Sequence, residues 1–134
     1  MKNQKISHAD GVEYFMSSIK FDCSLPKQKN NSYHFIATKE SIDQKIRVAI
    51  RNETDKTTPS SHFKFNPNDE YDWLALVFNF ENEKQSWIIP KDIAIKHTTA
   101  SKKGAIHIKK ISLSYKTLKE NHFKIFENNW LLNK

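Results

Sequence analysis

The sequence contains little cysteine and little glycine. Of its 134 residues, one is cysteine, Cys23, and two are glycine, Gly11 and Gly104. A single cysteine excludes an intramolecular disulfide, which is compatible with a reducing compartment, and it adds nothing to a zinc site. Two isolated glycines argue against a glycine-rich phosphate loop. We therefore expect neither a disulfide scaffold nor a nucleotide-binding loop of that kind.

Long apolar segments are also missing. The longest strongly apolar run, Trp73 to Phe78, has the length of a strand rather than of a membrane-spanning helix. Residues 1–8 contain no apolar segment of the kind found in secretory signals. These features predict a cytoplasmic protein without membrane contact. Nine Phe, four Tyr and three Trp can fill one core, so we expect a single domain over residues 1–134, with residues 1–6 disordered.

Positive charge is abundant and unevenly distributed. The chain holds 22 Lys and Arg against 15 Asp and Glu, a formal charge of +7. Residues 91–124 contain nine lysines and two acids, so this segment carries as much net charge as the whole chain. Segregated positive charge is typical of a phosphate-binding surface, and the alternative is a solvated lysine surface. The lysines that we select as candidate nucleic-acid contacts are Lys96, Lys102, Lys103, Lys109 and Lys110.

The hydrophobic pattern predicts helices at both ends of the chain and strands between them. Ser7 or Asp10 is expected to cap a helix over Gly11–Ile19, whose apolar residues recur at helical spacing. Leu118–Leu132 is expected to form a C-terminal helix. The expected strands are Tyr33–Thr38, Lys45–Arg51, His62–Phe65, Tyr71–Phe80, Trp87–Ile89 and Ala105–Ser114. This order predicts an α+β fold in which a central mixed sheet is flanked by the N-terminal and C-terminal helices.

The segment Lys45–Arg51 is the clearest strand. Ile46, Val48 and Ile50 alternate with cationic residues, so one face is apolar and the other carries Arg47 and Arg51. Two arginines on one face can bind phosphates bidentately. The alternatives are an edge strand protected by charge, or arginines that pair with nearby acids.

Catalytic patterns are sparse. The tripeptide Asp43-Gln44-Lys45, with Glu13 upstream, fits the minimal acid-x-lysine arrangement with which metal-dependent nucleases hold Mg²⁺ or Mn²⁺ and position water. Cys23 is more typical of a small buried residue than of a nucleophile. The six histidines lack partners at ligand spacing, so the identity of any metal ligands remains open; they are His8, His34, His62, His97, His107 and His122.

Over residues 8–132 the layout resembles the PD-(D/E)XK nuclease superfamily, in particular its small restriction-like and intron-encoded members. The resemblance rests on an acid-bearing first helix with Glu13, followed by strands in a similar order and an aromatic C-terminal segment. The segments that carry it are Tyr33–Ala37, Lys45–Arg51, His62–Phe65, Asp69–Phe78, Ser86–Pro90 and Asn128–Trp130. The resemblance implies a restriction-endonuclease-like fold and a role on nucleic acid.

The catalytic signature departs from that family. In the register that buries Ile46, Val48 and Ile50, Arg51 occupies the lysine position and Ala49 the position of the metal-binding acid. The acid of the preceding strand falls near His34. This register implies a degenerate nuclease without a metal site or cofactor. The other register keeps Asp43 and Lys45 as the motif.

Three functions follow from these observations. The first is a nuclease-like domain that binds DNA or RNA without cutting it, through Arg47, Arg51 and the selected lysines. The second is an active endonuclease that uses Glu13, Asp43 and Lys45 with Mg²⁺ or Mn²⁺. The third is a protein-interaction module, such as a toxin-neutralising or assembly subunit, whose acidic cluster at Asp69–Asp72 contacts a protein partner. A homo-oligomer is compatible with each of them.

Overall fold

The computed structural model describes residues 6–27, 32–53, 62–65, 69–80, 83–96, 99–100, 111–114, 118 and 121–134. Its helices are α1 (His8–Ser18), α2 (Lys91–Lys96) and α4 (Asn121–Lys124). Its strands are β1 (Asp22–Ser24), β2 (Phe35–Lys39), β3 (Ile42–Glu53), β4 (His62–Phe65), β5 (Trp73–Phe80), β6 (Glu83–Pro90), β7 (Thr99–Ala100) and β8 (Ile111–Ser114). Within these ranges, no helix is long and apolar enough to cross a membrane.

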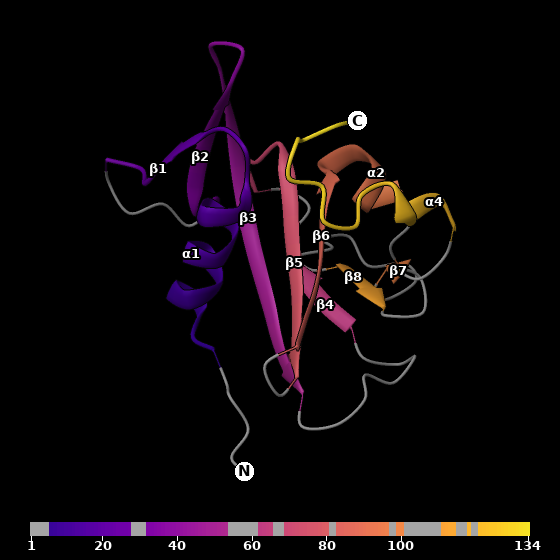
Figure 1. Cartoon of the computed structure of the whole chain (residues 1–134). Helices are drawn as coiled ribbons and strands as arrows, with labels where there is room; N and C mark the ends of the chain where they lie inside the picture. The colour runs from indigo at the N-terminus through magenta and orange to yellow at the C-terminus, as the bar shows by residue number, and fades with distance from the viewer. Residues whose placement is uncertain are drawn as a thin grey trace.

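Two sheets form the fold. The larger is mixed and has the order β1-β2-β3-β5-β6, in which β3 and β5 are parallel and the other neighbours antiparallel. The smaller has the order β4-β8-β7 and is antiparallel. Figure 1 shows α1 on one side of the larger sheet, and the smaller sheet with α2 and α4 on the other. The expected α+β class is confirmed.

Helix α1 begins where the sequence predicts a cap. The Ser7 hydroxyl accepts a hydrogen bond from the Asp10 N–H at 3.0 Å, and the Asp10 carboxylate accepts one from the Ser7 N–H at 3.0 Å. This reciprocal pair satisfies two N–H groups at the start of the helix. The hydrogen bond from the Ser7 backbone N–H to the carboxylate, followed by one from the Ser7 side chain, lowers the pKa of Asp10. Val12 and Phe15 then point into the core, so the apolar stripe of the sequence is the buried face of α1.

Strands β3 and β5 place the core on both sides of the larger sheet. Ile46 and Val48 face α1, together with Trp73, Ala75 and Val77 of β5. Ile50 is partly buried against the same group. The alternate residues of β5, Leu74, Leu76 and Phe78, face the smaller sheet. Strand β3 lies between β2 and β5, but β2 pairs with it only from Ile42 to Ile46 and β5 only from Ile46 to Glu53. Among the described residues, Arg47–Arg51 therefore has a strand partner on one side only, as the edge-strand interpretation expects.

Gly11 sets the distance between α1 and β3. A Cβ at this position would lie 2.6 Å from Cγ2 of Ile50. Because Ile50 is β-branched and stiff at χ1, its methyl group cannot easily move aside. We therefore expect Gly11→Ala to lower the free energy of unfolding by about 1–2 kcal/mol, since overpacking outweighs the better helix propensity of alanine.

Urea denaturation of Gly11→Ala tests this contact. Ser17→Ala, an exposed substitution on the same helix, is the control and is expected to change stability by less than about 0.5 kcal/mol. A Gly11→Ala protein that is as stable as the wild type would show that α1 does not press on β3 as described.

The C-terminal segment differs from the prediction of a helix over Leu118–Leu132. Helix α4 ends at Lys124, and the chain then crosses the edge of the larger sheet beside β6. The N–H of Ile88 donates to the Phe126 carbonyl and the N–H of Asn128 to the Ser86 carbonyl, each at 3.0 Å. Phe126 is buried on the face of the smaller sheet, whereas Trp130 packs on the α1 face. A helix over these residues would keep both rings on one side. The hydrogen bonds to the edge strand β6 therefore outweigh the helical pattern of the sequence.

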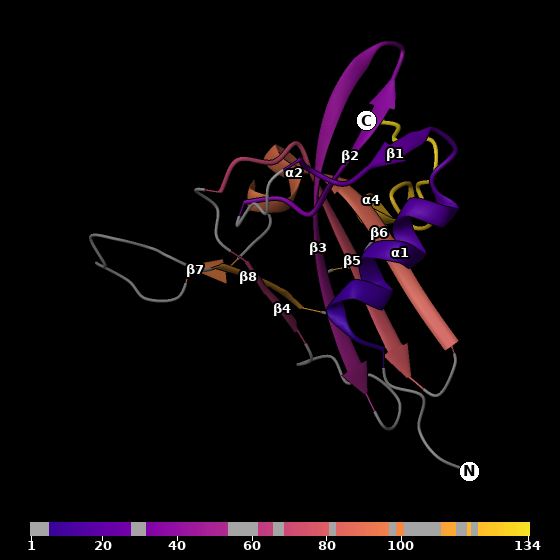
Figure 2. The same cartoon turned by 90° about the vertical axis from the view of Figure 1, so that its left-hand side faces the viewer.

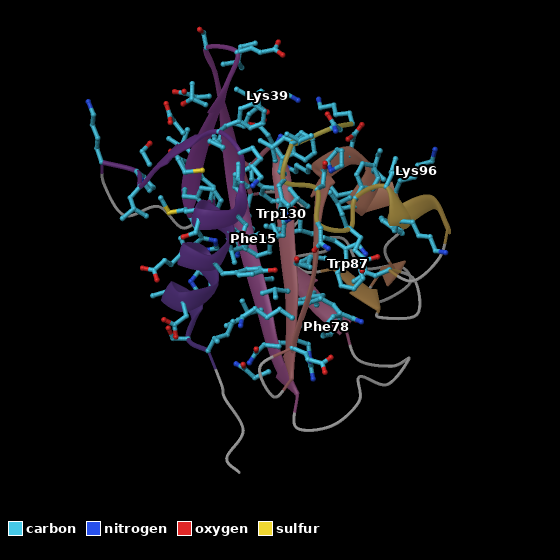
Figure 3. All side chains as sticks on the ribbon, viewed as in Figure 1. Phe15, Lys39, Phe78, Trp87, Lys96 and Trp130 are labelled. Atoms are coloured by element: carbon cyan, nitrogen blue, oxygen red, sulfur yellow. The ribbon has the colours of Figure 1, made fainter. Side chains whose placement is uncertain are left out.

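Figure 3 shows the outcome of this crossing. Trp130 lies beside Phe15 of α1, whereas Phe78 and Trp87 lie on the side of the smaller sheet. The ring centroids of Phe15 and Trp130 are 6.1 Å apart. The face opposite α1 is therefore covered by the smaller sheet and two short helices, rather than by one long C-terminal helix.

Candidate functional site

Two histidines occupy the edge of β3 beyond the start of β2. His34 precedes β2, and its Nδ1 accepts a hydrogen bond from the Val48 N–H at 2.8 Å. Nε2 of His8, in the first turn of α1, lies 3.2 Å from the Val48 carbonyl oxygen. The two rings meet edge to face with centroids 4.2 Å apart. The two imidazoles thus take the place of a β-strand partner for the N–H and the carbonyl of Val48.

The environment of His34 keeps its ring neutral. Burial lowers the pKa of His34 to about 4, and His8 and Arg47 add smaller contributions in the same direction. An imidazole whose Nδ1 accepts a hydrogen bond carries its proton on Nε2. Around neutral pH, His34 therefore presents Nε2–H as a donor.

The lowered pKa of His34, which is due mainly to burial, makes stability depend on pH. Between pH 6.5 and about 4 the unfolded chain binds a proton at this position and the folded chain does not. Stability is therefore full above pH 6.5 and is lost as the pH falls through this window. Since the ring is half-buried, solvent screening limits the loss to about 1–2 kcal/mol.

Substitution by asparagine tests this linkage. In His34→Asn the amide oxygen takes the place of Nδ1 and accepts from Val48 without titrating. Urea denaturation at pH 7 and at about pH 4.5 is expected to give a smaller loss of stability for His34→Asn than for the wild type. Equal losses for the two proteins would contradict the assignment.

A pocket opens beside this histidine pair. It has a volume of about 830 Å³ and lies between α1, β1 and the segment that leads into β2. Its apolar walls include Met16, Phe21 and Tyr33, and His8 and His34 also line it. The sequence does not predict this pocket, because Met16 belongs to the apolar stripe expected to face the core and His34 lies in an expected strand. It forms when β1 and the loop before it fold against α1.

Cys23 lines the same pocket from β1. Burial, followed by the charge of Asp22, raises the pKa of its thiol. Little thiolate is therefore present near neutral pH, and nucleophilic chemistry at Cys23 is not supported. Its Sγ donates to the Phe21 carbonyl at 3.4 Å, as expected for a structural thiol.

Asp43 and Lys45 do not line this pocket, whereas Glu13 does. Asp43 is exposed near the start of β3, where its Oδ1 accepts from the Thr38 hydroxyl at 2.9 Å. The Lys45 ammonium lies over the Tyr33 ring, 5.5 Å from its centroid. Because side chains alternate along β3, Asp43 and Lys45 point to the face opposite Ile46 and α1. Glu13 is exposed on α1 itself.

The same alternation applies to the register in which Ala49 and Arg51 occupy the acid and lysine positions. Ala49 packs with the core on the side of the smaller sheet, and Arg51 shares its parity. In both registers, the acid and lysine positions of β3 therefore lie on the face opposite Glu13. Among the described residues, no group of three or more His, Cys, Asp or Glu side chains is placed to hold a metal ion. The donor set of Glu13, Asp43 and Lys45 does not fit a shared Mg²⁺ or Mn²⁺ site.

Arg47 forms an ion pair with Asp69. Its Nη1 lies 2.9 Å from Oδ2 of Asp69 and donates to the Ser32 carbonyl at 3.1 Å. Asp72 accepts from the Lys45 N–H at 2.8 Å. Two members of the acidic cluster Asp69–Asp72 thus hold β3 in place. This is the arginine–acid pairing that the sequence analysis left open.

The lysines of residues 91–124 are only partly described. Lys96 is exposed at the end of α2, on the side of the molecule away from α1 (Figure 3). Lys102, Lys103, Lys109 and Lys110 lie outside the described residues. The strands on either side of them are antiparallel neighbours in which Ala100 pairs with Ile111. Figure 2 shows this smaller sheet projecting from the face opposite α1.

Comparison with known proteins identifies a fold but no family. No protein-family model and no curated protein matches this chain. A solved structure of a bacterial homing endonuclease, I-Ssp6803I, is similar over 97% of this chain and 90% of its own, with a TM-score of 0.53 and 15% identity. MepB is similar over 82% of this chain and 80% of its own, with a TM-score of 0.36 and 12% identity. The similarity to I-Ssp6803I indicates that the chain has a nuclease-like fold.

Proposed function

We propose that the chain is a nucleic-acid-binding domain with a PD-(D/E)XK-like fold that binds DNA or RNA without cutting it. The observation that carries the proposal is the combination of a nuclease-like fold with the separation of Glu13 from Asp43 and Lys45. A metal-dependent nuclease needs its acids and lysine on one metal ion. Here α1 carries Glu13 on one side of the sheet, and β3 points the other two residues to the opposite side.

The binding surface lies on the side of the smaller sheet. The exposed Lys96 and Lys124 are on this side, where α2 and α4 lie (Figure 1). The described residues on either side of 101–110, a segment that contains four lysines, are Ala100 of β7 and Ile111 of β8, which are strand partners. Phosphate contacts by lysine are sequence-independent and release counterions, so the binding is electrostatic and weakens steeply with salt.

The arginines make a smaller contribution to this surface. Since Asp69 already compensates Arg47, its guanidinium adds little net charge toward a phosphate. Arg51 is half-buried on the same face of β3. We expect Arg47→Ala/Arg51→Ala to reduce the slope of log affinity against log salt by less than about 2, the value for two full phosphate contacts.

Fluorescence anisotropy of labelled duplex and single-stranded DNA and RNA over a salt series measures this slope. Because Arg47 also anchors β3, the double variant is first compared with the wild type by thermal unfolding, and binding is measured where both proteins are folded. A slope equal to that of the wild type would mean that neither arginine contacts nucleic acid.

A further inference from the structure

A partly exposed pair of aromatic rings lies where α1 meets the C-terminal segment. The rings of Tyr14 and Trp130 meet edge to face, with centroids 5.8 Å apart. Both side chains are half-buried, whereas Trp73 and Trp87 are 2% and 0% exposed. Figure 3 shows Trp130 beside Phe15 of α1. Aromatic surface is therefore accessible from solvent on this side of the larger sheet, and Trp130 is the tryptophan that a bound molecule can reach.

Hydrogen bonds fix the positions of both rings. The Ser86 hydroxyl donates to Oδ1 of Asn128 at 3.0 Å, so its oxygen accepts from the Tyr14 hydroxyl, also at 3.0 Å. The Trp130 carbonyl accepts from the N–H of Lys20 at 3.0 Å. Because the rings are already ordered, a molecule that stacks on them loses little additional conformational entropy of the protein.

Positive charge accompanies the aromatic pair. The exposed Lys84 ammonium lies 5.8 Å from the centroid of the Tyr14 ring. Because side chains alternate along β6, Glu83 points to the opposite face of the sheet. Glu127 forms a β-bridge with Trp87 and therefore shares its face, which is that of the smaller sheet. Both acids thus lie away from the aromatic pair.

The acids of α1 do not reverse this charge. The Asp10 carboxylate is engaged by the Ser7 N–H at 3.0 Å, and Glu13 lines the pocket between α1 and β1. Lys20, which follows α1 and is bonded to the Trp130 backbone, carries an exposed side chain. The surroundings of the aromatic pair therefore favour an anionic ligand over a cationic one.

We propose that Tyr14 and Trp130 form a stacking surface for an unpaired base of single-stranded DNA or RNA, and that Lys84 and Lys20 contact the adjoining phosphates. Aromatic rings beside cations bind single strands without sequence preference, because every base has a π face. In a duplex the bases stack on one another and cannot reach the rings. The inference rests on the proposed function for the class of ligand, and it adds a second surface on the opposite side of the larger sheet from Lys96.

Three oligonucleotides of about 12 nucleotides test the proposal: a deoxyuridine strand, a uridine strand, and an abasic strand with the same phosphates but no bases. Fluorescence anisotropy at low salt is expected to show the two strands with bases binding about fivefold more tightly than the abasic strand. They are also expected to quench the fluorescence of Trp130, which the abasic strand leaves unchanged. Tighter binding of the uridine strand indicates RNA as the ligand, and tighter binding of the deoxyuridine strand indicates DNA.

Variants separate stacking from charge. Trp130→Leu keeps an apolar side chain but offers no ring, so it is expected to lose both the quenching and the preference for strands with bases. Tyr14→Phe removes only a hydroxyl, and this matched control is expected to keep both. Lys84→Gln is expected to lower the slope of log affinity for single strands against log salt by about 0.7. Thermal unfolding identifies the temperature range in which all the variants are folded.

Each outcome separates this proposal from the proposed function. Equal affinity of the wild type for the three oligonucleotides, or an unchanged preference in Trp130→Leu, would overturn the stacking surface and leave electrostatic binding by the side of the smaller sheet intact. An unchanged slope in Lys84→Gln would overturn the phosphate contact of that lysine. Failure of all three strands to bind at low salt would overturn both proposals.

Discussion

Replacing Phe78 by alanine is expected to lower the free energy of unfolding by about 3–5 kcal/mol. Phe78 is fully buried on β5, and its ring centroid lies 4.4 Å from that of Phe63 in β4 and 6.1 Å from that of Trp87 in β6. The side chain thus joins the smaller sheet to the larger one. Its removal leaves a cavity between the sheets, and cavities in cores cost more than the lost transfer free energy alone.

The measurement is urea denaturation followed by tryptophan fluorescence, with Ile125→Ala as the control. Ile125 is 68% exposed, so its truncation is expected to change stability by less than about 0.5 kcal/mol. A loss below about 1 kcal/mol in Phe78→Ala would mean that the smaller sheet does not pack on β5. The same variant is expected to weaken nucleic-acid binding, because β7 and β8 of the smaller sheet flank residues 101–110, which we call the lysine-rich segment.

Reversing the charge of that segment is expected to have the largest effect on binding. Lys102, Lys103, Lys109 and Lys110 are changed together to glutamate, which removes four potential phosphate contacts and adds four repulsive charges. We expect the affinity for duplex DNA to fall about 100-fold or more at physiological salt, and the slope of log affinity against log salt to fall by about 3–4.

A control with the same change of charge separates local contacts from net charge. Lys20, Lys27, Lys84 and Lys134 are all exposed and lie outside the lysine-rich segment. Their replacement by glutamate is expected to reduce affinity by less than about tenfold, since exposed charges beyond a Debye length are largely screened. Equal losses in the two quadruple variants would mean that only the net charge attracts nucleic acid.

The elements that the sequence predicts well are those set by local pattern. Ser7 caps α1 as its spacing indicates, and the apolar run from Trp73 to Phe78 is an internal strand with residues buried on both faces. The alternation of apolar and cationic residues along β3 is also predicted correctly, since Ile46 and Val48 are buried on one face of the strand.

The C-terminal prediction fails because tertiary contacts override the local pattern. Phe126 and Trp130 are four residues apart, as on one side of a helix, yet the chain turns between them. Asn128 has φ 52° and Leu132 φ 51°, a left-handed conformation that leucine rarely adopts. Hydrogen bonds of this segment to β6, and burial of Leu132 on the α1 face, hold the turns in place.

The candidate sites depend on pairings between distant segments, which a single sequence does not encode locally. Val48 meets His34 because of the register of β2 on β3, and Arg47 meets Asp69 because β5 lies parallel to β3. Neither pairing leaves a periodic signal in the sequence. The acid-x-lysine tripeptide is readable, but its distance from Glu13 follows only from the side of the sheet that α1 covers.

One experiment tests the central proposal most directly. The purified protein is incubated with labelled duplex and single-stranded DNA and RNA, with and without Mn²⁺, and each sample is divided between a binding gel and a denaturing gel. Our account predicts salt-sensitive binding and intact nucleic acid in every lane. Cleavage that requires Mn²⁺ and disappears in Asp43→Ala would contradict it and make the protein an active nuclease. Absence of binding at low salt would contradict it as well, and would leave the nuclease-like fold with a role in protein interaction.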